Sequence, residues 1–226
     1  MTAESIVVGV AGYAFKGGFL VRVEDDRGNA GSAETLDQPE IRSSIGRWAN
    51  LLIGMPVFAT NARWDDRPRA DGPEWTGYSV LENALAGLGA AVASMALHEW
   101  LGGKANAERP PVASLESVVP EVRVLEAGDR EFDGVARFLV DSVVHAVVID
   151  PRHWSVPAIV RLDALCRTLQ IGIAFDVRGG GHVALGLAGE LAAALPMATL
   201  GVIASGAPRA SLSLAAPVLR LGQIRG

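Results

Sequence analysis

The stretch from Val143 to Gly201, VVHAVVIDPRHWSVPAIVRLDALCRTLQIGIAFDVRGGGHVALGLAGELAAALPMATLG, determines the fold that the sequence predicts. Its two short apolar runs, AVVID and IGIAFDV, are rich in β-branched residues and predict buried strands. Residues 156–169 carry apolar side chains at helical spacing, and the glycines at 179–181 precede an Ala- and Leu-rich helix that ends before Pro196. Strands alternating with helices are typical of parallel βα units, so we predict an α/β fold.

Both predicted strands end in an acidic residue, Asp150 in the first and Asp176 in the second. In parallel βα units the chemistry commonly lies where the strands end, which makes these residues the first catalytic candidates. Burial or a like-charged neighbour would raise the pKa of either carboxyl group and make it a better base. An aspartate at the end of a strand also commonly caps a turn or the next helix, and both interpretations stay open.

Two histidines extend this predicted strand-end face. His182 follows the three glycines, and His153 follows Asp150 by three residues; each is an acid–base candidate or a solvated loop residue. The RGGG segment at 178–181 could also present backbone N–H groups to an anion at the start of the second helix.

Composition limits the classes of function. Half of the 226 residues are hydrophobic, which predicts a globular protein. The net charge is −5, so a basic nucleic-acid-binding surface is not expected. The sequence carries neither a basic signal segment at its N-terminus nor an apolar run of membrane-spanning length, so we expect a cytoplasmic protein that does not bind a membrane.

Three segments together resemble the enolase superfamily, in its mandelate racemase/muconate-lactonizing branch. The 143–201 stretch, with LAAALP at 191–196, resembles the sixth and seventh βα units of the family barrel. The FLVRVEDDRGNAGSAE segment at 19–34 resembles the opening hairpin of the capping domain, and its Gly31 and Glu34 match the family pattern. The helix SVLENALAGLGAAVASMALHEWLGG at 79–103 resembles a cap helix.

That helix departs from the family pattern in two places. Ala86 and Gly87 replace a Trp-Asp pair, and residues 94–96 replace a Gly-x-Pro break, which predicts a helix that continues to Leu101. The polar segment 61–78 before it reads as a loop whose Trp64, Trp75 and Tyr78 either cover a substrate or anchor the loop.

The resemblance implies an α+β capping domain at residues 1–108 and a shortened (β/α) TIM-type barrel domain at residues 109–226. PPVASLES at 110–117 resembles the first barrel strand, and VRVLEAGDREFDGVARFLV at 122–140 resembles the fifth strand and helix. We therefore expect barrel units two to four to be missing and the chain to stop before it returns to the cap. Open sheet edges need covering, so we expect a homodimer, a higher oligomer or a heteromer with a full-length relative.

The resemblance also implies a chemistry, in which three carboxylates hold Mg²⁺ while Lys or His removes the α-proton of a carboxylate substrate. Asp129 is the one acidic residue at a matching metal position, and one carboxylate is too few for Mg²⁺. Asp176 stands where the family has its catalytic His, and no lysine follows Lys104. We therefore expect no cofactor, or Mg²⁺ if the family chemistry survives.

Two hypotheses of function remain. The first is a degenerate, non-catalytic binding or partner subunit, with a small carboxylate as a possible ligand. The second is an isomerase or lyase, of the racemase or dehydratase type, that uses a rebuilt and possibly inter-subunit site containing Asp129, Asp150, Asp176 and a histidine such as His182.

Overall fold

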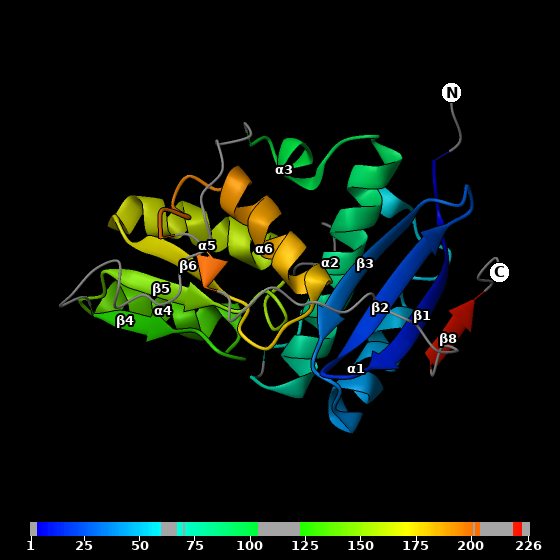
Figure 1. The fold of residues 1–226 in the computed structure, drawn as a ribbon, viewed down its shortest axis with the longest axis horizontal. Helices are drawn as coiled ribbons and strands as arrows, with labels where there is room; N and C mark the ends of the chain where they lie inside the picture. The colour runs from blue at the N-terminus through cyan, green and yellow to red at the C-terminus, as the bar shows by residue number, and fades with distance from the viewer. Residues whose placement is uncertain are drawn as a thin grey trace.

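Two four-stranded sheets, one antiparallel and one parallel, organise the part of the chain that the structure describes (Figure 1). The structure is a computed structural model, and it describes residues 4–59, 67–69, 71–103, 123–200, 202–203 and 219–222. Helices pack between and around the two sheets. The predicted α/β fold is confirmed.

The antiparallel sheet has the strand order β3-β2-β1-β8. Its strands are β1 (Val7–Phe15), β2 (Gly18–Asp25), β3 (Ala30–Thr35) and β8 (Leu219–Gly222). The turn between β2 and β3 places Gly28 at φ 87°, the left-handed backbone that the DDRGN segment predicts. The predicted hairpin is therefore present.

The last of these strands corrects one expectation. From the sequence we expect the C-terminal segment to belong to the barrel part and to end before any return to the cap. Instead, β8 pairs antiparallel with β1, with Gly222 opposite Gly9 and Leu219 opposite Gly12. Alternate apolar residues, Leu219 and Leu221, pack against the core of the antiparallel sheet, which explains why this short strand joins it.

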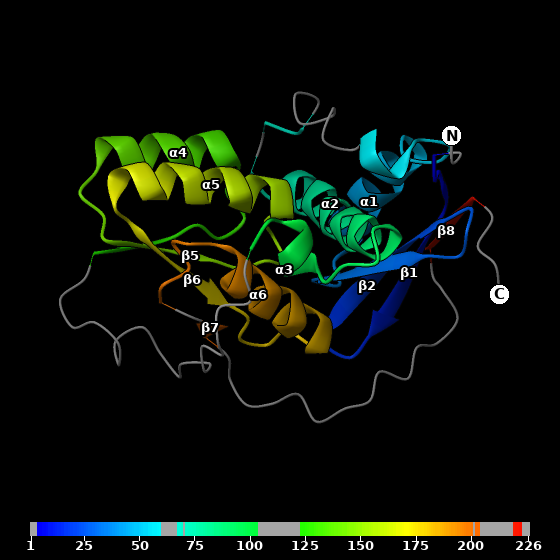
Figure 2. The same ribbon diagram turned by 90° about the horizontal axis from the view of Figure 1, so that it is seen from above.

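Helices α1 (Pro39–Asn50) and α2 (Pro73–Val92) cover one face of the antiparallel sheet (Figure 2). The sheet contributes Val10, Phe19 and Val21 to the shared core, and the helices contribute Ile45 and Leu85. Gly31 in β3 lies directly against the backbone of α2, where a Cβ atom would overlap the carbonyl oxygen of Ala84. The glycine that matched the family pattern thus permits close packing of helix on sheet.

Both ends of α2 differ from the sequence-based expectation. The helix begins at Pro73 because residues 73–78, predicted as loop, bury Trp75 and Tyr78 in the cores. It ends at Val92, and a separate short helix α3 (Leu97–Trp100) follows. Ser94 adopts φ 56°, and the N–H groups of Ser94 and Met95 bond back to the carbonyls of Ala91 and Ala90. This left-handed cap stops the helix without the family's glycine and proline.

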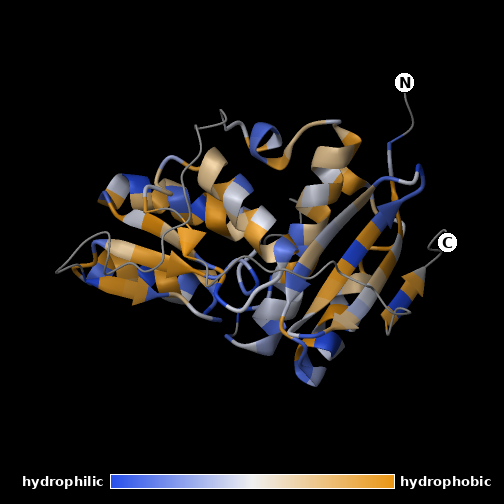
Figure 3. Ribbon diagram, in the orientation of Figure 1, coloured by the Kyte–Doolittle hydropathy of each residue, from blue (hydrophilic) through white to orange (hydrophobic). Residues whose placement is uncertain are grey.

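The parallel sheet has the strand order β4-β5-β6-β7, as the alternating pattern predicts. Its elements are β4 (Val124–Glu126), α4 (Phe132–Asp141), β5 (Ala146–Ile149), α5 (Val156–Leu169), β6 (Gly172–Asp176), α6 (His182–Ala194) and β7 (Val202–Ile203). Alternate residues of β5 and β6, including Ile149 and Phe175, face the helices in one hydrophobic cluster. Figure 3 shows these strands as predominantly hydrophobic.

Helix α2 joins the two cores. Trp75 and Ala86 belong to the cluster under the parallel sheet, whereas Val80 and Leu88 belong to the cluster under the antiparallel sheet. The buried amide of Asn83 donates to the carbonyls of Pro151 and Trp154 at 2.9 and 3.0 Å and accepts from the N–H of Val156. These bonds fix the turn between β5 and α5, which carries the strand-end residues.

The predicted first barrel strand at 110–117, the boundary at 108 and the missing units between 117 and 122 all lie outside the described residues, as does Trp64.

Candidate functional site

The carboxyl ends of β5 and β6 carry the same local motif, an aspartate followed two residues later by an arginine. Asp150 accepts hydrogen bonds from the Arg152 guanidinium through both carboxylate oxygens, at 2.6 to 3.0 Å. It also accepts from the Arg152 backbone N–H at 2.9 Å. Both side chains are largely buried, so this ion pair is screened little by solvent.

Asp176 and Arg178 repeat this geometry at the next strand, with side-chain bonds of 2.5 to 3.0 Å. Partial burial alone would raise the pKa of the Asp176 carboxyl group. Hydrogen bonds from Arg178, together with the charges of Arg178 and Arg152, outweigh burial and hold that pKa below its ordinary value. Asp176 is therefore anchored as a carboxylate.

Arg152 links the two aspartates. Its guanidinium also donates to the carbonyl oxygen of Arg178 at 3.0 Å, and the charges of Asp150, Glu34 and Asp176 outweigh its burial and raise its pKa. The structure thus brings the two predicted catalytic aspartates into one group, with an arginine between them. We call Glu34, Asp150, Arg152, Asp176 and Arg178 the strand-end charge cluster.

Glu34 reaches this cluster from the other sheet. Its carboxylate accepts from the backbone N–H groups of Gly181 at 2.6 Å and Ala184 at 3.3 Å, in the first turn of α6. From the sequence, this turn after RGGG is a candidate site for an external anion. That prediction is wrong, because the buried side chain of Glu34 already occupies the position.

A cavity of about 280 Å³ adjoins the cluster, between the starts of α1 and α2 and the turns that follow β4 and β5. Its polar lining includes Thr76, Asp129 and His153. The Nδ1 atom of His153 lies 3.0 Å from the Thr76 hydroxyl, and its Nε2 atom lies 3.9 Å from Asp150. Asp129 is exposed at the rim of this cavity.

The imidazole of His153 favours its neutral form. Burial lowers its pKa and the charge of Arg152 lowers it further; Asp150 and Asp129 raise it, but less than burial lowers it. A neutral imidazole beside a cavity is able to accept a proton. His153, one of two histidines considered from the sequence, therefore has the better environment for an acid–base group.

The other candidates lie elsewhere. His182 is the first residue of α6 and is exposed, and among the described residues no hydrogen bond or ion pair joins it to the strand-end charge cluster. Trp75 packs edge-to-face on Trp154 at 5.8 Å, and Tyr78 packs on Trp48 at 5.2 Å. These two aromatic residues anchor α2, which is the second of the two alternatives for them.

The donor set does not fit the Mg²⁺ ion of the implied chemistry. Both oxygens of Asp150 and of Asp176 are bonded to guanidinium groups, whose positive charges lie where a cation would have to approach. Of these three aspartates, Asp129 is the one whose carboxylate is bonded to no guanidinium group within the described ranges, and it lines the cavity. Throughout the described ranges, no group of three or more His, Cys, Asp or Glu side chains is arranged to hold a metal ion.

Sequence reasoning missed the arginines. Arg152 and Arg178 stand in DPR and DVR, and this repeated Asp-x-Arg spacing at two successive strand ends was a readable signal. Thr76 gave no such signal, because its position beside His153 depends on α2 starting before it.

None of the helices in the described ranges is both long and apolar enough to cross a membrane.

Comparison with solved structures shows which known proteins share this fold. No protein-family model matches the sequence, and no curated protein is detectably similar to it. Solved structures do match. An enolase protein from Sargasso Sea environmental sequencing has a TM-score of 0.73 at 14% identity, over 91% of this chain and 87% of that chain.

Two further structures agree. An enolase from Pseudomonas fluorescens, solved with magnesium, potassium and tartrate, has a TM-score of 0.67 at 14% identity, covering 89% of this chain and 82% of that one. A mandelate racemase/muconate lactonizing enzyme from a Polaromonas species has a TM-score of 0.58 at 11% identity, covering 90% and 87%. At such identities the likeness concerns the fold. The resemblance first seen in LAAALP and the 19–34 hairpin is thus confirmed in three dimensions, and the chain has the fold of the enolase superfamily.

Proposed function

We propose that this chain is a divergent protein of the mandelate racemase/muconate-lactonizing type that acts as a non-catalytic binding or partner subunit. The observation that carries the proposal is the pair of bidentate Asp–Arg bridges at the ends of β5 and β6. Each bridge ties a strand-end carboxylate to an arginine of the same turn, so that both residues have structural partners where the related fold would place reactive groups.

The chemistry of the alternative explains why these bridges matter. Removing the α-proton of a carboxylate needs a base whose pKa lies near the working pH and a cation that stabilises the resulting enediolate. The lowered pKa of Asp176 makes it a weak base. Arg152 and Arg178 are positive, but their donors are directed at their own aspartates, so little of that charge is available to a substrate.

One observation supports a second candidate function, an isomerase or lyase with a rebuilt site. His153 is partly buried, with 16% of its side chain exposed, favours its neutral form and lines the 280 Å³ cavity with Asp129 and Thr76. A substrate α-carbon held in that cavity would lie next to a group able to accept its proton. In this candidate the base comes from the turn after β5, not from Asp176.

Proton exchange in D₂O separates the two functions. The protein is incubated with hydroxy acids, dipeptides and lactones, with and without Mg²⁺, and deuterium at the α-position is followed by NMR. We expect no incorporation above the uncatalysed rate. In parallel, thermal unfolding with the same compounds reports binding, and we expect at least one carboxylate to raise the melting temperature without exchange.

Variants identify the base if exchange does occur. Loss of exchange in Asp176→Asn would overturn the non-catalytic proposal and make Asp176 the base. Loss in His153→Asn, with Asp176→Asn active, would establish the second candidate. His182→Asn is the matched control, because His182 is an exposed histidine outside the cluster. A protein that neither exchanges protons nor is stabilised by any carboxylate would leave only the partner-subunit form of the proposal.

A further inference from the structure

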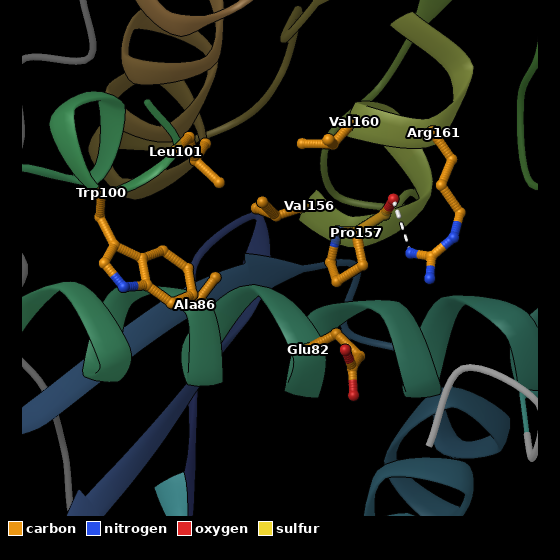
Figure 4. Close-up of a pocket in the computed structure, with 8 residues that line it drawn as sticks. All are labelled: Glu82, Ala86, Trp100, Leu101, Val156, Pro157, Val160 and Arg161. Carbon is orange, nitrogen blue, oxygen red and sulfur yellow. Dashed lines mark hydrogen bonds between the residues drawn. The ribbon is translucent and has the colours of Figure 1, made fainter. Parts of the chain in front are cut away.

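The cavity beside the strand-end charge cluster differs from a larger cavity in the charges of its lining. The larger one, of about 580 Å³, lies between α2, α3 and α5 and is lined by Glu82 and Arg161 together with apolar residues (Figure 4). Both charged side chains interact with other groups of the protein. The cavity of about 280 Å³ described above is lined by one carboxylate, that of Asp129, and by no arginine or lysine among the described residues. A ligand can therefore compensate the charge of this smaller cavity.

The carboxylate of Asp129 is accessible from the cavity. Asp129 is exposed, and within the described ranges its carboxylate is bonded to no guanidinium group. Two glycines border it. A Cβ atom on Gly72 would have the Oδ2 atom of Asp129 as its nearest neighbour, at 3.8 Å, and a Cβ atom on Gly128 would meet nothing within 4 Å. Because these neighbours carry no side chain, they leave the carboxylate uncovered.

The backbone around Asp129 is fixed on two sides. The N–H of Gly72, at the start of α2, donates to the carbonyl oxygen of Asp129 at 2.9 Å. The indole N–H of Trp154, in the turn after β5, donates to the carbonyl oxygen of Gly128 at 3.1 Å. The turn after β4 is thus bound to two other elements. A ligand does not have to order this turn, which lowers the entropic cost of binding.

The charges around this cavity favour a cation. Asp150 and Arg152 compensate each other through their bidentate bridge. Burial lowers the pKa of His153, so its imidazole is predominantly uncharged at neutral pH and does not repel a positive group. The charge of Asp129 remains. An anion would be repelled by it, whereas a cation gains a charge-assisted hydrogen bond.

The rest of the lining sets the size and shape of the ligand. Leu36, Ile41 and Pro73 form an apolar wall, in which Ile41 is only 2% exposed. Gln38 and Thr76 also line the cavity, and their amide and hydroxyl oxygens are hydrogen-bond acceptors. The volume of about 280 Å³ lies just below the range of about 300–1,000 Å³ that is usual for drug-sized ligands, so the ligand has few carbon atoms.

We propose that this cavity binds a small primary amine in its ammonium form. The three N–H donors of an ammonium group match three acceptor groups of the lining, those of Asp129, Gln38 and Thr76, and the carbon chain packs on the apolar wall. This inference rests on the binding function proposed above and adds the charge of the ligand. A carboxylate compound that enters this cavity must also carry an amine.

NMR titration with three probes of similar size tests the assignment. At neutral pH n-butylamine is a cation, 1-butanol is uncharged and butyrate is an anion. We expect saturable one-to-one binding of n-butylamine, an affinity at least about tenfold lower for 1-butanol, and no saturable binding of butyrate, because the charged hydrogen bond is lost or replaced by repulsion. The backbone amide signals of Gly72 and His153 should move with n-butylamine, and that of Val160 in the larger cavity should not. Equal affinities for the three probes would overturn the proposal.

An exposed variant ties the binding to Asp129. Asp129→Asn removes the charge at a position that does not threaten folding, and it should reduce the affinity for n-butylamine to that for 1-butanol. Asp141→Asn, an exposed aspartate at the end of α4, is the matched control and should bind like the wild type. Unchanged n-butylamine binding in Asp129→Asn would contradict the assignment.

The two proposals fail in different experiments. Deuterium exchange into a carboxylate would overturn the non-catalytic function and would leave the binding of n-butylamine as measured. A protein that neither exchanges protons nor binds n-butylamine would overturn the present inference, while the non-catalytic function would stand.

Discussion

The carboxylate of Glu34 and the backbone N–H of Gly181 lie 2.6 Å apart although 147 residues separate them in the sequence. Glu34 is the second-last residue of β3 in the antiparallel sheet, and Gly181 precedes the helix α6 that packs on the parallel sheet. Because Gly181 has no side chain to cap that helix, an acidic residue from the other sheet does so. The two sheets are joined by this contact as well as by α2.

Replacing Glu34 should therefore destabilise the whole described fold. Glu34→Ala removes the acceptor of the partly buried N–H group of Gly181 and of the buried N–H group of Ala184, and we expect the free energy of unfolding to fall by about 1–3 kcal/mol. Glu34→Gln keeps one acceptor oxygen and should lose less. Urea denaturation measures both, with Glu4→Ala at an exposed position as the control. A Glu34→Ala protein as stable as that control would show that the cap contributes nothing.

Gly31 offers a test of the close packing between β3 and α2. In Gly31→Ala the new Cβ would overlap the backbone at Ala84 and Leu88, so we expect a loss of about 3 kcal/mol or failure to fold. Gly186→Ala is the matched control, because this exposed residue of α6 has open space around it. There the same change should stabilise by about 0.5–1 kcal/mol through helix propensity. Thermal unfolding reports both effects, and equal melting temperatures would refute the packing argument.

Stability should depend on pH through His153. Burial holds the pKa of this residue in the folded protein below its ordinary value of 6.5, so between the two values the unfolded chain binds more protons than the folded one. The free energy of unfolding should therefore fall as pH decreases below 6.5, by at most about 1.4 kcal/mol per pH unit. His153→Asn should flatten this slope between pH 6.5 and 5, and the surface variant His182→Asn should retain it. An unchanged slope in His153→Asn would contradict this account.

Exposed apolar residues beside β4 predict self-association. Val124, Phe138, Val140 and Val143 are 40 to 69% exposed, and β4 lies at the end of the strand order with β5 as its neighbour among the described strands. We expect a dimer or larger oligomer by light scattering after size exclusion at micromolar concentration. The double change Val140→Glu and Val143→Glu should shift it toward monomer, whereas Leu51→Glu, an exposed leucine outside this region, should not. A wild-type monomer would contradict the prediction.

Local sequence patterns were enough for the two central strands of the parallel sheet, β5 and β6, and for the helices that follow them. The apolar run before Asp150, the helical spacing of 156–169 and the glycines at 179–181 each act over a few residues, and each element formed where its pattern predicts. The end of α2 was harder to predict, because the left-handed backbone of Ser94 is uncommon for a residue other than glycine. Residues 73–78 read as loop because their burial comes from tertiary contacts.

In the candidate site, too, the features set by local sequence patterns could be predicted and those set by tertiary contacts could not. Placing Asp150 and Asp176 at neighbouring strand ends required only the βα pattern. Their pairing with Arg152 and Arg178 was present in the Asp-x-Arg spacing, but the two interpretations considered from the sequence, catalysis and capping of a turn or helix, did not include an ion pair. The role of Glu34 could not be predicted, since it depends on how two separate sheets pack together.

The pairing of β8 with β1 has a consequence for synthesis of the chain on the ribosome. Residues 9–12 emerge among the first, yet their partners at 219–222 emerge about 200 residues later. Until then one edge of β1 has no partner strand and is open to other strands, including those of neighbouring nascent chains. The hairpin of β1 and β2 therefore belongs to an incomplete sheet during this time. Completion of this sheet is thus a late, long-range step, and a ribosome-stalled chain that ends before residue 219 should be the form most prone to aggregate.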